Sequence, residues 1–256
     1  MARGVLVAGN WKMNLTLEDS IALAASLAAD ATTTTTVEIA VFPQMPWLLP
    51  VAHALRETGI GVGAQNGHPL ASGAFTGEVS IGAIAPHCRY ILAGHSERRH
   101  LFGESDEFVG EKVRATIAAG SRAILCVGET LREREDGLAE AVVVRQLGAG
   151  LAGLDAQQLG AVTIAYEPVW AIGTGIAATP DDAQAMSAVV RRWIAEHYSH
   201  PVAQQIRILY GGSVTPENAA ALFALADVDG GLVGGASLKA ESFLKIVAAA
   251  VRTLDL

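Results

Sequence analysis

The sequence predicts an α/β fold, a single closed barrel in which eight parallel strands are surrounded by helices, known as the (β/α)8 architecture. The first observation is length, because 256 residues fit one large barrel or two small domains. The second is that short apolar runs recur eight times along the chain. The third is that helix-like segments separate these runs, whose starts lie roughly 30 residues apart, the size of a βα unit.

The apolar runs predict the strands. Most of them are almost continuously apolar rather than alternating, which is typical of parallel strands that are buried on both faces. The last run is the shortest and weakest. In chain order the runs are 5–8, 37–42, 60–64, 90–93, 123–127, 161–166, 206–209 and 231–233.

The segments between the runs have the apolar spacing of amphipathic helices. Glu18 and Asp19 open the first segment, where the helix dipole favours acidic side chains. Pro180 and Pro216 stand where the first turn of a helix tolerates proline. The expected helices are 17–30, 106–119, 131–151, 181–198, 216–225 and 238–254.

No linker or shift in composition divides the chain, so we expect one domain over residues 1–256. The alternative is an open, doubly wound sheet, but no G-x-G-x-x-G motif follows an early strand. The threonine run 32–36 is predicted to be a solvated connection.

Composition limits the class of protein. Hydrophobic residues make up 51% of the chain and the net charge is −8, which disfavours nucleic acid and anionic membranes as partners. No secretory signal or run of 18 apolar residues is present, so we expect a cytoplasmic protein without a membrane span. Cys88 and Cys126 fit a reducing compartment, and the absence of a C-x-x-C pair argues against a metal cluster.

Chemically informative residues follow five of the predicted strands. They are Asn10 and Lys12 after the first, His95 after the fourth, Glu167 after the sixth, Gly211-Gly212-Ser213 after the seventh and Gly234-Gly235 after the eighth. Each is weak evidence alone, because lysines and glutamates are mostly exposed and paired glycines often form turns. In a (β/α)8 barrel, however, all of them lie at the end that carries active sites.

Together these residues suit one kind of chemistry. The glycine pairs let backbone N–H groups approach a phosphate, and Lys12 adds a positive charge. Glu167 is a candidate general base. His95 precedes an expected helix start at Ser96, so its ring can accept a backbone N–H and stay neutral. The set predicts proton abstraction beside a carbonyl in a small phosphorylated substrate.

Five blocks of sequence resemble the triosephosphate isomerase family, in order and along essentially the full chain: NWKMN at 10–14, GHSERR at 94–99, YEPVWAIGTG at 166–175, YGGSV at 210–214 and LVGGASL at 232–238. The resemblance implies a TIM barrel without metal or cofactor. It implies reversible interconversion of dihydroxyacetone phosphate and D-glyceraldehyde 3-phosphate through an enediol(ate).

The resemblance also implies roles for individual residues. Glu167 is then the general base, His95 the electrophile and Lys12 the electrostatic stabiliser. The substrate would be bound by Asn10, Lys12, Gly173, Ser213, Gly234 and Gly235. Residues 168–178 would form a mobile lid that excludes water. Glu97 would lie near Lys12, and Tyr210 and Ser213 would hydrogen-bond the closed lid.

The family resemblance further implies a homodimer. Residues 65–78 resemble the family's protruding loop, and Thr76 would reach into the neighbouring subunit's site. The plainer reading is an ordinary long surface loop. Arg191 and Asp227 match a buried ion pair of the family.

Two other functions are weighed against this one. A phosphate-binding barrel aldolase would form a Schiff base on Lys12, which needs a desolvated, uncharged lysine. A lysine beside a phosphate-binding site is instead expected to stay charged, because the anion raises its pKa. Borohydride trapping with substrate distinguishes the two. A non-catalytic binding protein is disfavoured because all three catalytic residue types are present.

The chain departs from the family at the end of the lid, where Ile176-Ala177 replaces the usual lysine followed by threonine or valine. We predict that the double substitution Ile176→Lys with Ala177→Thr changes turnover by less than about tenfold, a barrier change of ~1.4 kcal/mol. Steady-state kinetics of both proteins tests this. A hundredfold gain in turnover would reject the prediction.

Overall fold

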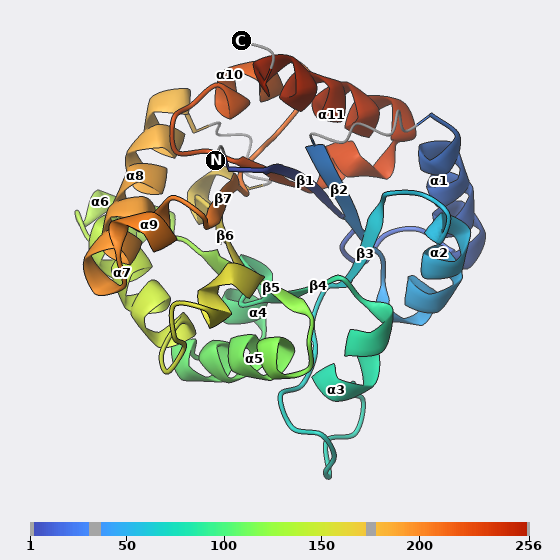
Figure 1. Cartoon of the computed structure of the whole chain (residues 1–256), viewed down its shortest axis with the longest axis horizontal. Helices are drawn as coiled ribbons and strands as arrows, with labels where there is room; N and C mark the ends of the chain where they lie inside the picture. The colour runs from blue at the N-terminus through green and yellow to red at the C-terminus, as the bar shows by residue number, and fades with distance from the viewer. Residues whose placement is uncertain (1–2, 31–36, 173–177, 255–256) are drawn as a thin grey trace.

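The computed structural model describes residues 3–30, 37–172 and 178–254 and contains a closed barrel of eight parallel strands in chain order (Figure 1). The strands are β1 (Val5–Asn10), β2 (Val37–Phe42), β3 (Gly61–Ala64), β4 (Tyr90–Ala93), β5 (Arg122–Val127), β6 (Val162–Tyr166), β7 (Arg207–Tyr210) and β8 (Gly230–Val233). Each predicted run coincides with a strand to within two residues, so the predicted (β/α)8 barrel is confirmed.

The barrel closes between its first and last strands. β1 pairs with β2 from Val5 opposite Val37 onward, and with β8 from Leu6 opposite Gly230 onward. Gly230 has a φ of +127°, and a Cβ there would lie 1.9 Å from the carbonyl oxygen of Leu6. Only glycine permits both this conformation and this close approach of the strands.

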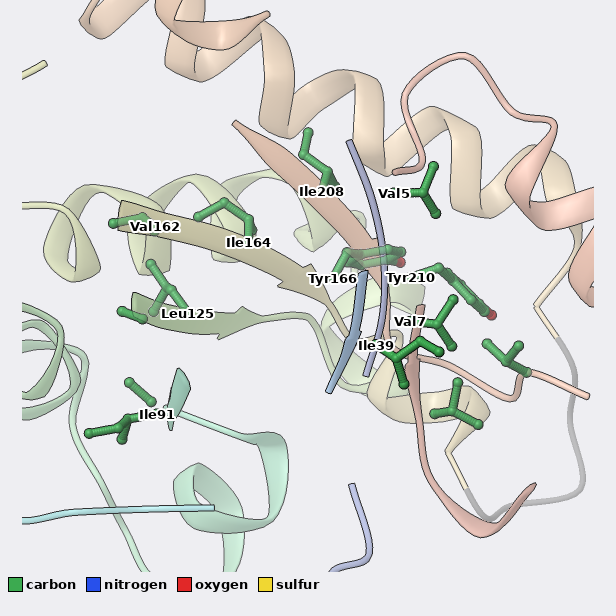
Figure 2. Close-up of a cluster of buried hydrophobic side chains, with 14 of the residues drawn as sticks. Val5, Val7, Ile39, Ile91, Leu125, Val162, Ile164, Tyr166, Ile208 and Tyr210 are labelled. Atoms are coloured by element: carbon green, nitrogen blue, oxygen red, sulfur yellow. The ribbon is translucent and has the colours of Figure 1, made fainter. Parts of the chain in front are cut away.

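Side chains of each strand point alternately into the barrel and out toward the helices. On β5, Ile124 and Cys126 belong to an inner cluster composed only of strand residues, whereas Leu125 belongs to the larger outer cluster. Figure 2 shows part of the outer cluster, including Leu125 and Ile164. Because both faces are buried, the strands read as continuous apolar runs in the sequence.

Helices surround the strands (Figure 1). The longer ones are α1 (Leu17–Asp30), α2 (Leu48–Leu55), α5 (Asp106–Ala118), α7 (Ala139–Gly150), α8 (Pro180–His197) and α11 (Ala240–Leu254). The shorter ones are α3 (Ile81–Ile84), α4 (Ser96–Leu101), α6 (Leu131–Glu135), α9 (His200–Ala203) and α10 (Ala219–Phe223). The described residues also form five 3-10 turns, which are η1 (Met45–Trp47), η2 (Ala85–His87), η3 (Gln158–Ala161), η4 (Val169–Ala171) and η5 (Gly235–Leu238).

The expectation of one helix over 131–151 is wrong. α6 ends at Glu135 and α7 begins at Ala139. Between them Gly137 has a φ of +73° and donates its N–H to the Arg134 carbonyl. A left-handed glycine after the last turn is a common helix end. The helix expected over 216–225 is also shorter, and α2 was not anticipated.

Three further features bear on earlier expectations. Arg191 is buried and pairs with Asp227 at 2.7 Å, and also with Asp229 at 2.7 Å. The segment between β3 and α3 extends away from the barrel, at the bottom of Figure 1. Within the ranges that the structure describes, no helix is both long and apolar enough to span a membrane.

Candidate active site

A cavity of about 450 Å³ opens at the carboxyl ends of the strands. Its wall includes Asn10, Lys12, His95, Glu167, Gly211, Gly212, Ser213, Gly234 and Gly235. The predicted site residues from five different strands therefore meet in one place. Gly173 belongs to the residues outside the described ranges.

Lys12 is held at three points. Its backbone is left-handed, with a φ of 51°, a conformation that costs energy for any residue except glycine. Asn10 Oδ1 accepts its backbone N–H at 3.0 Å, and Gln65 Nε2 donates to its carbonyl at 2.7 Å. Its Nζ lies 2.6 Å from Glu97 Oε1. The ammonium group is thereby fixed on the cavity wall.

His95 caps the amino end of α4, as expected. Its Nδ1 accepts the backbone N–H of Glu97 at 3.3 Å, so the proton of a neutral ring lies on Nε2. That Nε2 is 3.0 Å from Oε1 of Glu167, and the His95 ring is buried. The ring therefore presents a donor to the cavity next to the candidate base.

Glu167 follows β6 and is 2% exposed. Its Oε2 accepts the backbone N–H of Ser96 at 2.7 Å. Burial raises the pKa of Glu167, but His95, the Ser96 N–H and Lys12 lower it, and the balance lies below the usual value. The carboxyl group is thus ionised and able to accept a proton.

The charge state of His95 is set by opposing effects. Burial lowers the pKa of His95 and the Glu167 carboxylate raises it, with a net upward shift. The direct contact with Glu167 therefore favours the charged ring. The N–H of Glu97 on Nδ1 favours the neutral ring that the sequence predicts.

The backbone of Glu167 packs against Gly128 without space for a side chain. A Cβ on Gly128 would lie 1.7 Å from the Glu167 carbonyl oxygen. Buried Gln146 on α7 bonds both sides of Gly128: its Oε1 accepts the N–H at 2.7 Å, and its Nε2 donates to the carbonyl at 3.2 Å. Gln146 and Gly128 thus fix the backbone position of Glu167, the candidate base, on the side away from the cavity.

The glycine pairs form the opposite rim of the cavity. Gly234 precedes η5, and a Cβ there would lie 3.7 Å from Lys12 Cε. A Cβ on Gly212 would lie 2.3 Å from the Tyr210 hydroxyl oxygen. Tyr210 itself is buried and belongs to the outer cluster, so it does not line the cavity. The rim combines exposed backbone with a nearby ammonium group, which suits an anion.

Several residues near the site were not anticipated as functional. Buried Glu129 accepts hydrogen bonds from Tyr166 Oη at 3.1 Å and Trp170 Nε1 at 2.8 Å. Glu129 and Gly128 directly follow β5, a strand end to which the sequence argument assigned no role. Their place directly after an apolar run is the signal in the sequence that could have identified both residues.

A second cavity of about 270 Å³ adjoins the first and shares Asn10, Lys12 and His95 with it. It also contacts Met13 and Phe102, which are 87% and 67% exposed. Thr76 lies in the protruding segment, is exposed, and lines neither cavity of this chain. Among the described residues, no three His, Cys, Asp or Glu side chains are arranged to hold a metal ion.

Comparison with known proteins gives one family. The family model "Triosephosphate isomerase" matches residues 5–250. A triosephosphate isomerase of Symbiobacterium thermophilum is 52% identical over 97% of both chains. Those of Chloroflexus aurantiacus and Endomicrobium trichonymphae are 49% and 48% identical, over 94% and 96% of this chain and 97% and 98% of their own.

The contact behind Glu167 leads to a prediction for Gly128→Ala. The new Cβ must displace the Glu167 backbone, and a shift of ~1 Å at a catalytic group costs on the order of a hundredfold in rate. We expect kcat to fall by about that factor, measured by steady-state kinetics. Gly148→Ala on α7 is the control, since its Cβ would make only an ordinary contact at 3.8 Å. Equal kcat values for the two variants would contradict the argument.

Proposed function

The chain belongs to the triosephosphate isomerase family and interconverts dihydroxyacetone phosphate and D-glyceraldehyde 3-phosphate, and we propose that Glu167, His95 and Lys12 perform this reaction. The observation that carries the assignment is the buried 3.0 Å contact between Glu167 and His95 in a cavity that also holds the Lys12 ammonium. A base, a hydrogen-bond donor and a cation are what an enediolate intermediate requires.

Glu167 transfers the proton. Its carboxylate takes a proton from the carbon that bears the hydroxyl group, which leaves an enediolate, and returns the proton to the neighbouring carbon. To do so, Oε2 exchanges its bond with the Ser96 N–H for contact with the substrate. The lowered pKa of Glu167 keeps the free enzyme in the basic form.

His95 acts on the two substrate oxygens. With substrate between the ring and Glu167, the Nε2–H donates to the carbonyl oxygen rather than facing the carboxylate. The contact that raises the pKa of His95 is then broken, while the Glu97 N–H bond to Nδ1 persists. The ring therefore donates from its neutral form, and Lys12 and Asn10 stabilise the negative charge that develops.

The substrate phosphate binds at the glycine-rich rim. Backbone N–H groups of Ser213, Gly234 and Gly235, with Gly173, are the proposed donors, and Lys12 adds its charge. Residues 168–178 are the proposed lid, of which 173–177 lie outside the described residues. We assign Tyr210 and Ser213 to the closed lid, where water exclusion limits loss of phosphate from the enediolate.

We further propose that residues 1–256 act as one cytoplasmic barrel domain and assemble as a homodimer. Support for the dimer comes from exposed Met13 and Phe102 beside the active-site cavity, and from the protruding segment that carries Thr76. Large apolar side chains that are exposed together beside a cavity are typical of an interface. Thr76 of each subunit would complete the neighbouring site.

The aldolase alternative has less support. The Lys12 Nζ is 2.6 Å from the Glu97 carboxylate, whereas a Schiff-base lysine is activated in a hydrophobic pocket or beside another cationic group. A protein that only binds its ligand would not need a buried carboxylate in contact with a histidine ring, as Glu167 and His95 are.

Replacing the base tests the assignment. Glu167→Gln keeps the shape and the Ser96 bond but removes the basic oxygen, so kcat should fall by at least about a thousandfold. The assay couples dihydroxyacetone phosphate formation to its NADH-dependent reduction. Glu57→Gln, an exposed and distant carboxyl, serves as the control. An inactive wild-type protein, or a fully active Glu167→Gln variant, would overturn the proposal.

The dimer is tested by light scattering after size-exclusion chromatography. We expect about twice the chain mass of 26.6 kDa, and the Phe102→Asp variant should be monomeric and less active, because a buried charge disfavours an apolar interface. Leu138→Asp, which changes an exposed leucine on another part of the surface, should remain dimeric. A monomeric wild-type protein refutes the dimer while leaving the assigned chemistry intact.

A further inference from the structure

Arg134 lies between the two ends of the proposed lid. It belongs to the last turn of α6, and its side chain is one-third exposed. On one side it faces Trp170, three residues after the catalytic base. On the other side it faces Asp182, in the first turn of α8, just beyond the end of the lid.

At the first end, Arg134 contacts the group that holds Trp170. The guanidinium carbon lies 4.6 Å from the centre of the Trp170 ring, within cation–π range. Its Nη1 also donates to Glu129 Oε1 at 3.3 Å, the same oxygen that accepts the Trp170 indole N–H. The arginine therefore covers one face of the indole and binds its acceptor.

At the second end, Arg134 Nη2 forms an ion pair with Asp182 Oδ1. The other oxygen of this carboxylate accepts from Thr179 Oγ1 at 2.7 Å and from the Thr179 N–H at 3.0 Å, which completes a capping box. Partial burial raises the pKa of Asp182, but Thr179 and Arg134 lower it by more, so the net shift is downward and the Asp182 carboxylate stays ionised at neutral pH. Arg134 is thus anchored to the residue where the chain leaves the lid.

We propose that Arg134 is a positioning residue that ties the two ends of the lid together through Trp170 and Asp182. The proposal rests on the proposed function, since it gives the role of this arginine in that same reaction. Arg134 touches neither cavity of the site. It acts by fixing where residues 168–172 and 178–182 stand relative to each other.

Arginine suits this position better than lysine. A planar guanidinium can stack on an indole while it directs separate N–H groups to two carboxylates, whereas the compact ammonium group of lysine has neither the planar face nor the fixed fork of donors. Arg134→Lys therefore keeps the charge but loses the bridge. Arg134→Met keeps most of the aliphatic packing but loses both the charge and the bridge between Trp170 and Asp182.

The effect on the reaction is a lid that fits its closed position less well. An enediolate exposed to water can expel phosphate: the C–O bond breaks, inorganic phosphate leaves with the electron pair, and the three-carbon enol that remains becomes methylglyoxal. The number of phosphate ions released per isomerisation therefore measures how well the closed lid protects the intermediate. A purely stabilising side chain would not change this ratio.

The experiment compares Arg134→Met and Arg134→Lys with Arg132→Met. Arg132 lies on the same helix, is 91% exposed and pairs only weakly with Asp136, at 3.8 Å. We expect Arg134→Met to lower kcat/KM by about tenfold and to raise phosphate release per isomerisation several-fold. Arg134→Lys should resemble it, and Arg132→Met should match the wild type. Urea unfolding of each variant identifies any general loss of stability.

A double-mutant cycle with Asp182→Asn tests whether the two ends are linked. If Arg134 acts through Asp182, the double variant should release no more phosphate than Arg134→Met alone. Asp181→Asn, one residue earlier, is the control for Asp182. An unchanged phosphate ratio in Arg134→Met, or fully additive effects in the cycle, would overturn the inference. Neither result would affect the assigned isomerisation, which an inactive wild-type protein alone would refute.

Discussion

Closure of the barrel between β8 and β1 is the constraint on which the active site depends. Gly230 allows the backbone of β8 to approach Leu6 closely enough to complete the ring of strands. This closure places Gly234 against the Lys12 side chain, although more than two hundred residues separate them. The position of the glycine rim relative to the Lys12 ammonium group therefore depends on one strand pairing.

Charge in the site is local and shared. The chain carries a net charge of −8, but the cavity holds an ammonium group, an imidazole and backbone N–H groups. Each ionisable group already has a partner: Lys12 contacts Glu97, and His95 contacts Glu167. These pairings avoid the cost of burying an isolated charge, so the groups can be held in place before any substrate binds.

The position of Glu167 is fixed by residues that lie outside the cavity. Gln146 fixes Gly128, and the Glu167 backbone packs directly against Gly128, with no space between them for a side chain. Glu129 holds the chain on both sides of Glu167, through Tyr166 before it and Trp170 after it. All three supporting residues belong to the β5 to α7 region. That region supplies rigid support for the cavity wall, while Lys12, His95 and Glu167 themselves follow other strands.

The sequence alone determined the strand order and which residues stand at the strand ends, because apolar periodicity and turn residues are local properties. It also predicted that His95 would cap a helix. Only the tertiary structure decided that Glu167 rests on the Ser96 N–H, that Gly128 abuts its carbonyl, and that α6 and α7 are separate helices. Those contacts join residues far apart in the chain, and the left-handed turn at Gly137 interrupts an otherwise continuous helical pattern. A pattern of residue types does not specify distances between residues that are far apart in the chain. Those distances are set when the barrel closes and its strands pack against one another.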